Sequence, residues 1–355
     1  MKTIFINLIL ALACNFCFSQ NNFDTNQIND SLLNLLKNED AGTAVIITKN
    51  NEIIYEKYFG YANIEESQIL NQSTKMGIAS MSKQFTGMAI LSLIEEGYIK
   101  NIDDAIEDYL PKYIPNGENI SIRQLLSHVS GLPEITQNDN FMSTINQEKS
   151  IDQILDLILI ENMRHNPGEK YQYCNTAYII LAKLIEKTSG ISYEEYLKRH
   201  IFEPLRMTNT YCGNTNHENI AMRYIADSSN YILAEEICFS NLIGGGNIIS
   251  NVCDMAKWNN ALLTGNNLPT NYKDLFISTK LNSGESTGYG LGIGHNTYND
   301  IEYYYHPGMG AGMNSINMIF PTENISICVI RNIFPSRQTT NEIAFKICEI
   351  IFSNN

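Results

Sequence analysis

Residues 76–90 read MGIASMSKQFTGMAI, a loop that leads into a mostly apolar helix continuing to residue 94. Ser80 and Lys83 stand near the start of this helix. They are three positions apart, so both lie on one face with their Cβ atoms roughly 5–6 Å apart. The lysine amine can therefore reach the serine hydroxyl, and the unpaired N–H groups of a helix N-terminus favour negative charge on a nearby oxygen. Since a serine beside an amine of lowered pKa is an activated nucleophile, Ser80 is the candidate nucleophile and Lys83 its activating partner.

The Ser-x-x-Lys tetrad alone is weak evidence, because about one is expected by chance in a chain of this length. The alternative is a helix that is capped by Ser80 and directs Lys83 into solvent. Two observations count against this alternative. The tetrad occurs once in the chain, and the helix behind it is too apolar for a surface helix.

Composition and charge narrow the functional classes. The 355 residues are 44% hydrophobic and 17% charged, as in an ordinary globular protein with one large core or two smaller ones. The formal net charge of −14 argues against nucleic acid and anionic membrane surfaces as partners, because both require a basic face. No H-E-x-x-H or Walker A motif is present.

Residues 1–19 have the pattern of a signal peptide, with Lys2 before an apolar run and a small-residue cleavage position after Ser19. A membrane anchor is disfavoured because the apolar run is shorter than the about 20 residues that a span needs. Lipid attachment at Cys14 is a weaker alternative, since the large Leu12 precedes it. No later stretch is long and apolar enough to cross a bilayer. We therefore expect a periplasmic or secreted product.

The six cysteines after residue 19 are scattered, with no C-x-x-C pair and no metal-ligand spacing. An exported protein can form disulfides, but the spacing does not pair these six. A domain of this size does not require them. We expect buried free thiols and no metal site.

The apolar periodicity predicts strands near both ends of the chain and a mostly helical middle. We therefore expect an α+β domain, in which residues 20–74 and 286–355 form a sheet part and residues 75–285 a mostly helical insertion. A ligand site is expected in the cleft between the two parts. The predicted strands are residues 43–48, 53–59, 289–295, 301–305, 313–320 and 325–331; the predicted helices are 27–36, 122–126, 151–160, 175–187 and 341–352.

A second candidate segment, PGEKYQYCNT at residues 167–176, is a turn that runs into a helix. Tyr173 and Asn175 flank one residue, so a loop can direct both side chains the same way. A phenol near an ammonium group loses its proton more easily and can act as a base toward a serine. Asn175 can bind a substrate amide. The alternative is a helix start capped by Asn175 beside a packed tyrosine.

A third candidate segment, YYYHPGMGAG at residues 303–312, contains alternating glycines. Glycines such as Gly308 let the backbone approach a substrate closely, and a strand here can present an N–H group to an oxyanion. His306 can orient Tyr173 or bind a carboxylate, although a lone histidine beside a glycine-rich turn is usually structural. A nucleotide-binding loop is excluded because no helix pattern follows.

The three segments, in this order, resemble the motifs of the serine β-lactamase and penicillin-binding-protein superfamily, most closely its branch of class C β-lactamases, DD-peptidases and esterases. Residues 80–83 match its S-x-x-K, residues 173–175 its Y-x-N, and residues 306–308 its K/H-T/S-G. The resemblance extends over residues 40–335. It implies an antiparallel sheet flanked by helices with an inserted, mostly helical domain.

The resemblance also implies acyl transfer to water through an acyl-serine on Ser80, with Lys83 sharing its proton and Tyr173 as general base. Asn175 would bind substrate, and the N–H groups of Ser80 and Met309 would form the oxyanion hole. His306 stands where relatives have Lys or His. The implied substrate is a small molecule or a peptidoglycan peptide, and no metal or organic cofactor is implied.

One departure from the family pattern bears on the substrate. Pro307 replaces the Thr or Ser whose hydroxyl binds the substrate carboxylate in β-lactamases and DD-peptidases. This replacement weakens the case for both activities and favours an esterase or a hydrolase of other small amides. An alternative from another class is a non-catalytic cell-wall-peptide binder or sensor on the same fold. The intact Ser80, Lys83 and Tyr173 argue against this alternative.

Overall fold

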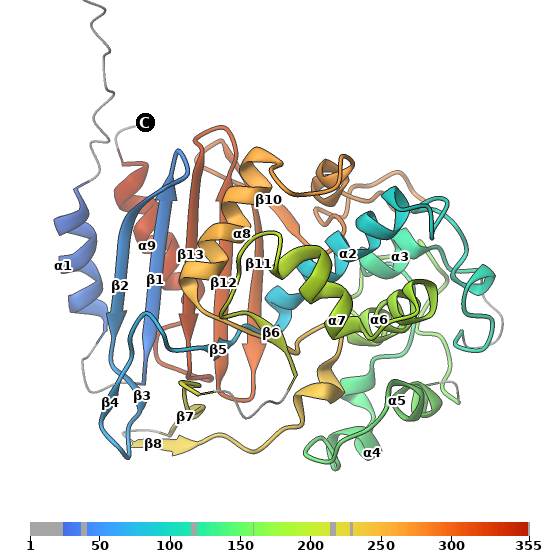
Figure 1. Cartoon of the computed structure of the whole chain (residues 1–355), viewed down its shortest axis with the longest axis horizontal. Helices are drawn as coiled ribbons and strands as arrows, with labels where there is room; N and C mark the ends of the chain where they lie inside the picture. Colours follow the sequence, from blue (N-terminus) through green and yellow to red (C-terminus); the bar gives the residue numbers. More distant parts are fainter. Residues whose placement is uncertain are drawn as a thin grey trace, which may run out of the picture.

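The computed structural model describes residues 24–36, 41–114, 119–158, 160–213, 218–227 and 230–353. Its main feature is a six-stranded antiparallel sheet in the order β10-β11-β12-β13-β1-β2 (Figure 1). The strands are β1 (Thr43–Lys49), β2 (Glu52–Phe59), β10 (Gly294–Tyr298), β11 (Ile301–Gly310), β12 (Met313–Phe320) and β13 (Ile325–Arg331). The N-terminal hairpin therefore completes the C-terminal strands, which confirms the predicted α+β fold.

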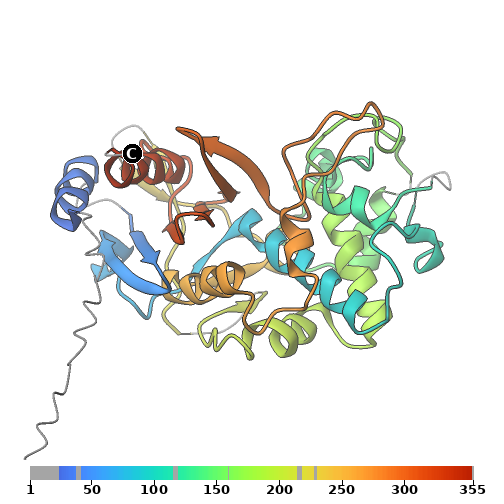
Figure 2. The same ribbon diagram turned by 90° about the horizontal axis from the view of Figure 1, so that it is seen from above.

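Helices cover both faces of this sheet (Figure 2). On β1, Val45 and Ile47 pack into one core with α1 (Thr25–Leu35) and α9 (Thr340–Ile351). Ala44 and Ile46 alternate with them and point into the other core, which includes side chains of α8 (Val252–Thr264). Successive strand residues point to opposite faces, so a strand that is covered on both sides reads as the continuous apolar run seen here.

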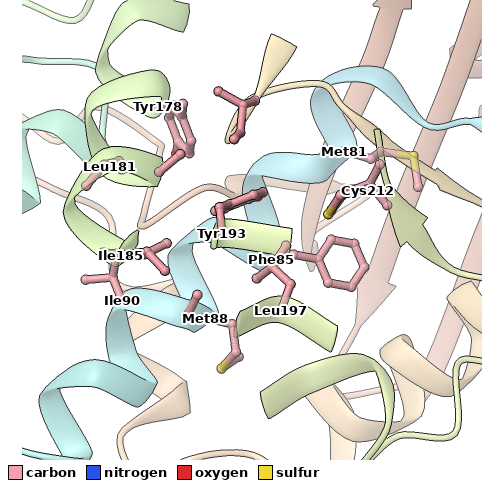
Figure 3. Close-up of a cluster of buried hydrophobic side chains, with 14 of the residues drawn as sticks. Met81, Phe85, Met88, Ile90, Tyr178, Leu181, Ile185, Tyr193, Leu197 and Cys212 are labelled. Atoms are coloured by element: carbon pink, nitrogen blue, oxygen red, sulfur yellow. The ribbon is translucent and has the colours of Figure 1, made fainter. Parts of the chain in front are cut away.

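The second part of the molecule is mostly helical and packs around α2 (Lys83–Glu95). Every residue of α2 from Lys83 to Leu93 is buried, which explains why its sequence is apolar on all sides. Figure 3 shows Phe85 and Met88 of α2 beside side chains of the neighbouring helices. Of the neighbouring helices, α6 (Asn175–Ser189) and α7 (Tyr193–Leu197) pack directly on α2 (Figure 3). The other helices of this part are α3 (Ile122–Leu126), α4 (Asp139–Met142) and α5 (Ile151–Ile158).

Short strands connect the two parts. A three-stranded sheet in the order β5-β9-β6 lies beside the nucleophile segment, and two hairpins, β3-β4 and β7-β8, lie at the edge of the molecule. Their bounds are β3 (Tyr61–Asn63), β4 (Gln68–Ile69), β5 (Met76–Gly77), β6 (Tyr211–Cys212), β7 (Tyr224–Asp227), β8 (Asn230–Leu233) and β9 (Ile248–Ser250).

Two expectations need correction. The strand predicted at residues 289–295 was wrong in position, because β10 begins only at Gly294. The preceding residues form a turn that packs against α2, in which Gly292 has a φ of +99° and a Cβ at that position would lie 2.5 Å from the Lys83 carbonyl oxygen. In addition, α8 belongs to the predicted helical part but packs on β1 and β13. The division at residues 75 and 285 otherwise stays a prediction.

The predicted signal peptide at residues 1–19, including Cys14, lies outside the described residues. In the part of the chain that is described, no helix has the length and apolar character needed to span a bilayer. Cys174, Cys212, Cys328 and Cys348 are buried free thiols, as predicted, whereas the free thiol of Cys253 is only partly buried.

Candidate active site

Ser80 lies in a tight turn at the start of α2. Residues Ala79–Ser82 form a 3₁₀ turn, and α2 begins with Lys83, so the two candidate residues straddle a junction and do not share one regular helix. Ala79 has a φ of +46°, a left-handed conformation that is uncommon for a residue other than glycine. The hydroxyl of Ser82 holds this conformation, since it donates to the Ala79 carbonyl (2.7 Å) and accepts from the Ile248 N–H (3.2 Å).

Lys83 is fully buried, and its amine connects three parts of the site. Nζ lies 3.2 Å from Ser80 Oγ, 2.9 Å from Asn175 Oδ1 and 2.8 Å from the carbonyl oxygen of Gly245. Burial lowers the pKa of Lys83 to about 7, although the negative charge of Glu134 acts in the opposite direction. A large fraction of the amine is therefore neutral near pH 7 and able to accept the Ser80 proton.

Tyr173 lies beside Lys83, in the segment before α6. Its ring centroid is 4.9 Å from Lys83 Nζ and 4.1 Å from the ring of the buried His128. Its hydroxyl is buried and faces the Ser80 hydroxyl, but among the described residues no hydrogen bond of normal geometry reaches it. Burial raises the pKa of Tyr173 well above its usual value, and the facing Ser80 hydroxyl lowers it only partly. The raised pKa keeps Tyr173 as a neutral phenol, whereas a general base would have to be the phenolate.

The third segment forms the end of strand β11, beyond the part that pairs with β10. A Cβ at Gly308 would lie 2.3 Å from the Ile78 carbonyl oxygen and 3.1 Å from the Ser80 nitrogen, so only glycine lets the strand pass this close. Met309 follows directly and lines the same cavity as Ser80. This approach brings the strand next to the Ser80 nitrogen, which is one condition for an oxyanion hole built from two backbone N–H groups.

His306 is placed differently from Ser80 and Met309. Its side chain is buried, and Nε2 lies 2.7 Å from the Tyr289 hydroxyl. Its ring centroid is 6.4 Å from that of Tyr173. The ring does not line the cavity beside Ser80, so this geometry gives no support to a direct contact with a substrate carboxylate.

The cavity beside Ser80 has a volume of about 210 Å³. None of its lining side chains carries a charge, and most are aliphatic or aromatic. It can therefore take an uncharged apolar group next to the nucleophile. The lining residues are Ala79, Ser80, Ile135, Thr136, Phe141, Met142, Ile145, Asn175, Ile179, Ile237, Asn241, Leu242, Ile243, Gly245, Gly246, Met309, Gly310, Ala311 and Met313.

Three contributors to the site were not singled out as site residues from the sequence. The carbonyl of Gly245 accepts from Lys83, Tyr289 binds His306, and Glu134 binds Asn175. For Gly245 and Tyr289 the sequence does carry a signal, since residues 244–246 and 289–292 match segments of the family pattern, whereas Glu134 has none. Among the described residues, no cluster of three or more His, Cys, Asp or Glu side chains could hold a metal ion.

With this geometry established, comparison with known proteins gives the family. The beta-lactamase family model matches residues 34–347, most of the chain. The chain belongs to the beta-lactamase family. Its three motifs occupy one site on this fold, as expected for the family's serine hydrolases.

The individual proteins that this beta-lactamase family member resembles are consistent with the family assignment. It is 32% identical over 278 residues to penicillin-binding protein 4* of Bacillus subtilis, which covers 72% of this chain and 60% of that protein. The octameric penicillin-binding-protein homologue from Pyrococcus abyssi superposes with a TM-score of 0.80 at 26% identity, covering 94% of this chain and 78% of the other. The D-amino acid amidase from Ochrobactrum anthropi SV3 shares the fold, with a TM-score of 0.81 at 22% identity over 93% of this chain and 99% of the amidase. The chain spans 60% to 64% of the length of the curated relatives it matches.

Proposed function

We propose that this protein is an exported serine hydrolase that forms an acyl-enzyme on Ser80 and hydrolyses neutral esters or amides of apolar acids. The observation that carries the proposal is the buried amine of Lys83, 3.2 Å from Ser80 Oγ and with a pKa lowered to about 7. A surface lysine would be protonated at neutral pH and could not take the serine proton. This amine can do so.

The reaction would proceed in two steps. In the first, Ser80 Oγ attacks the acyl carbon while its proton passes to Lys83, and the oxyanion lies at the N–H groups of Ser80 and Met309. The leaving alkoxide or amine takes a proton from the Tyr173 phenol, which regains one from the Lys83 ammonium. In the second step, water attacks the acyl-serine and the same groups return the proton to Ser80. In this sequence Lys83 is the base and Tyr173 relays protons, whereas the family resemblance gives Tyr173 the role of base.

The preference for neutral substrates follows from the charges around the cavity. A buried carboxylate without a partner is costly, and the cavity lining offers no cationic side chain. Pro307 has neither a hydroxyl nor an N–H group to donate to a carboxylate. The solved protein of this fold from Ochrobactrum anthropi SV3 is named a D-amino acid amidase, and the carboxamide group that an amidase cleaves is uncharged, which agrees with an amide as one substrate class.

Export to the periplasm or the medium is part of the proposal and is supported by the signal-peptide pattern of residues 1–19. N-terminal sequencing of the mature protein is expected to start at Gln20. A mature chain that retains Met1 or begins with lipidated Cys14 would contradict the proposed route.

The activity is tested with a fluorophosphonate probe and with p-nitrophenyl esters. Mass spectrometry should find the adduct on Ser80, and Ser80→Ala should abolish it. The wild-type protein should hydrolyse p-nitrophenyl butyrate. Its kcat/KM for the charged p-nitrophenyl hydrogen succinate should be at least about tenfold lower. An undiminished adduct in Ser80→Ala would refute the nucleophile. An absence of turnover by the wild type, with no adduct, would favour the non-catalytic binder.

A further inference from the structure

The carboxylate of Glu134 is almost completely buried next to the active site, with 6% of the residue exposed. Its Oε2 accepts the backbone N–H of Asn175 (2.6 Å), and its Oε1 accepts from Asn175 Nδ2 (3.0 Å). Oε1 also accepts from the backbone N–H (3.1 Å) and the hydroxyl (2.8 Å) of Thr136. Since three of these four donors are N–H groups that cannot accept, the group at this position must accept through both of its oxygens.

This arrangement determines which way the Asn175 amide points. Nδ2 faces the carboxylate of Glu134, so Oδ1 must face the other way, toward Lys83 Nζ at 2.9 Å. A neutral amine has two N–H donors and one lone pair. Asn175 Oδ1 and the Gly245 carbonyl take the two donors, which leaves the lone pair for the Ser80 hydroxyl. A reversed amide would point Nδ2 at the amine and compete for that lone pair.

We propose that Glu134 is a positioning residue of the active site, whose carboxylate fixes the Asn175 amide so that the Lys83 lone pair stays directed at Ser80. The inference rests on the proposed function, in which Lys83 takes the Ser80 proton. A glutamine amide at position 134 could not accept all of these hydrogen bonds and so could not fix the Asn175 amide in this way. Whichever way it turns, a glutamine places its NH₂ group against a backbone N–H of Asn175 or Thr136.

Glu134 also acts on Lys83 through its charge. The ionisable groups that influence the pKa of Lys83 are Glu134 and Cys174, and both raise it. Burial raises the pKa of Cys174 to about 11, so its thiol is neutral at pH 7. The amine is also flanked by the rings of Tyr173 and Tyr178 and lies near two further ionisable side chains, His128 and His306. Burial lowers the pKa of both histidines, which leaves Glu134 as the anion among these groups.

The test measures the rate of Ser80 labelling by a fluorophosphonate as a function of pH. In the wild type this rate should be level at high pH (the plateau) and fall at low pH (the acidic limb), where Lys83 becomes protonated. Glu134→Gln should lower the plateau rate about 10- to 100-fold, because the Asn175 amide is no longer fixed. It should also move the acidic limb about 1 pH unit down, because an anion near Lys83 is lost. Glu134→Asp keeps the charge but shortens the side chain, so its plateau should fall while its limb stays. Glu161→Gln is the matched control. It removes a carboxylate that binds Asn138 elsewhere in this part of the molecule, and it should change neither quantity.

A double-mutant cycle separates positioning from a general loss of structure. If Glu134 acts through Asn175, then Glu134→Gln in an Asn175→Ala background should lower the plateau less than about threefold, while the limb still moves. Additive plateau effects, or a Glu134→Gln enzyme with the wild-type plateau and limb, would overturn the inference and leave the proposed function intact. A wild-type protein that is not labelled at all would overturn the proposed function, and the role of Glu134 with it.

Discussion

The phenol oxygen of Tyr289 lies 2.7 Å from Nε2 of His306, and this contact limits what the third motif can bind. Nδ1 of the same ring lies 2.6 Å from the Pro307 carbonyl oxygen, which can only accept, so Nδ1 carries the proton and Nε2 accepts from the phenol. Burial and the nearby charge of Lys83 lower the pKa of His306 to about 3. The ring is therefore neutral at physiological pH, with both nitrogens occupied.

This neutrality predicts discrimination against substrates with a free C-terminal carboxylate. We expect N-acetyl-D-alanyl-D-alaninamide to be cleaved at the D-alanyl–D-alaninamide bond with a kcat/KM at least about tenfold above that of N-acetyl-D-alanyl-D-alanine, since the acid buries an unpaired charge. Pro307→Thr restores a hydroxyl donor and should narrow the ratio. Equal or faster cleavage of the acid by the wild-type enzyme would show that another group binds the carboxylate.

The lowered pKa of Lys83 predicts the pH dependence of activity. The neutral amine is the active form, and its fraction falls as the pH drops below the pKa of about 7. The kcat/KM for p-nitrophenyl butyrate should therefore be level above pH 7 and decrease tenfold per pH unit well below it. In Lys83→Arg the guanidinium stays protonated, so kcat/KM should fall by about 10²–10⁴ and lose this limb. A limb that persists unchanged in Lys83→Arg would assign it to another group.

Tyr173 is expected to contribute through its hydroxyl alone. Tyr173→Phe keeps the ring that packs against His128 and the amine of Lys83, but it removes the proton relay to the leaving group. We expect kcat/KM for an amide substrate to fall by about 10²–10⁴, with little change in melting temperature. Tyr171→Phe, two residues away and 40% exposed, is the matched control and should retain activity. A loss of only a few-fold in Tyr173→Phe would exclude proton transfer by this residue.

The sequence predicted five of the six strands of the main sheet and the helix at residues 175–187, because those segments carry a local signal, apolar periodicity. The structure shows this helix as α6, which ends at Gly190 in the left-handed conformation, with a φ of +76°. The prediction of a strand at residues 289–295 was wrong because the local signal there was misleading. The apolar residues of this segment pack against α2 through a turn that Gly292 permits, and no local pattern reveals that contact.

The same distinction applies to the candidate site. Ser80, Lys83 and Tyr173 could be found because they belong to spaced motifs, and the structure brings them together. Glu134 could not, because its role depends on contacts with Asn175, 41 positions along the chain. The pKa directions also depend on burial in the folded chain. For this reason the sequence favoured Tyr173 as base, whereas the structure favours Lys83.

The oxyanion site is tested most directly at Gly308. A Cβ at this position would lie 2.3 Å from both the Ile78 carbonyl oxygen and the Ser315 hydroxyl, and 3.1 Å from the Ser80 nitrogen. Gly308→Ala must therefore push β11 away from the nucleophile turn and separate the N–H groups of Ser80 and Met309. Because loss of one oxyanion donor costs about 10²–10³ in kcat, we expect a decrease of that size with p-nitrophenyl butyrate. The melting temperature and the circular dichroism spectrum of the variant show whether it still folds. A folded Gly308→Ala protein with wild-type kcat would mean that the oxyanion is stabilised elsewhere.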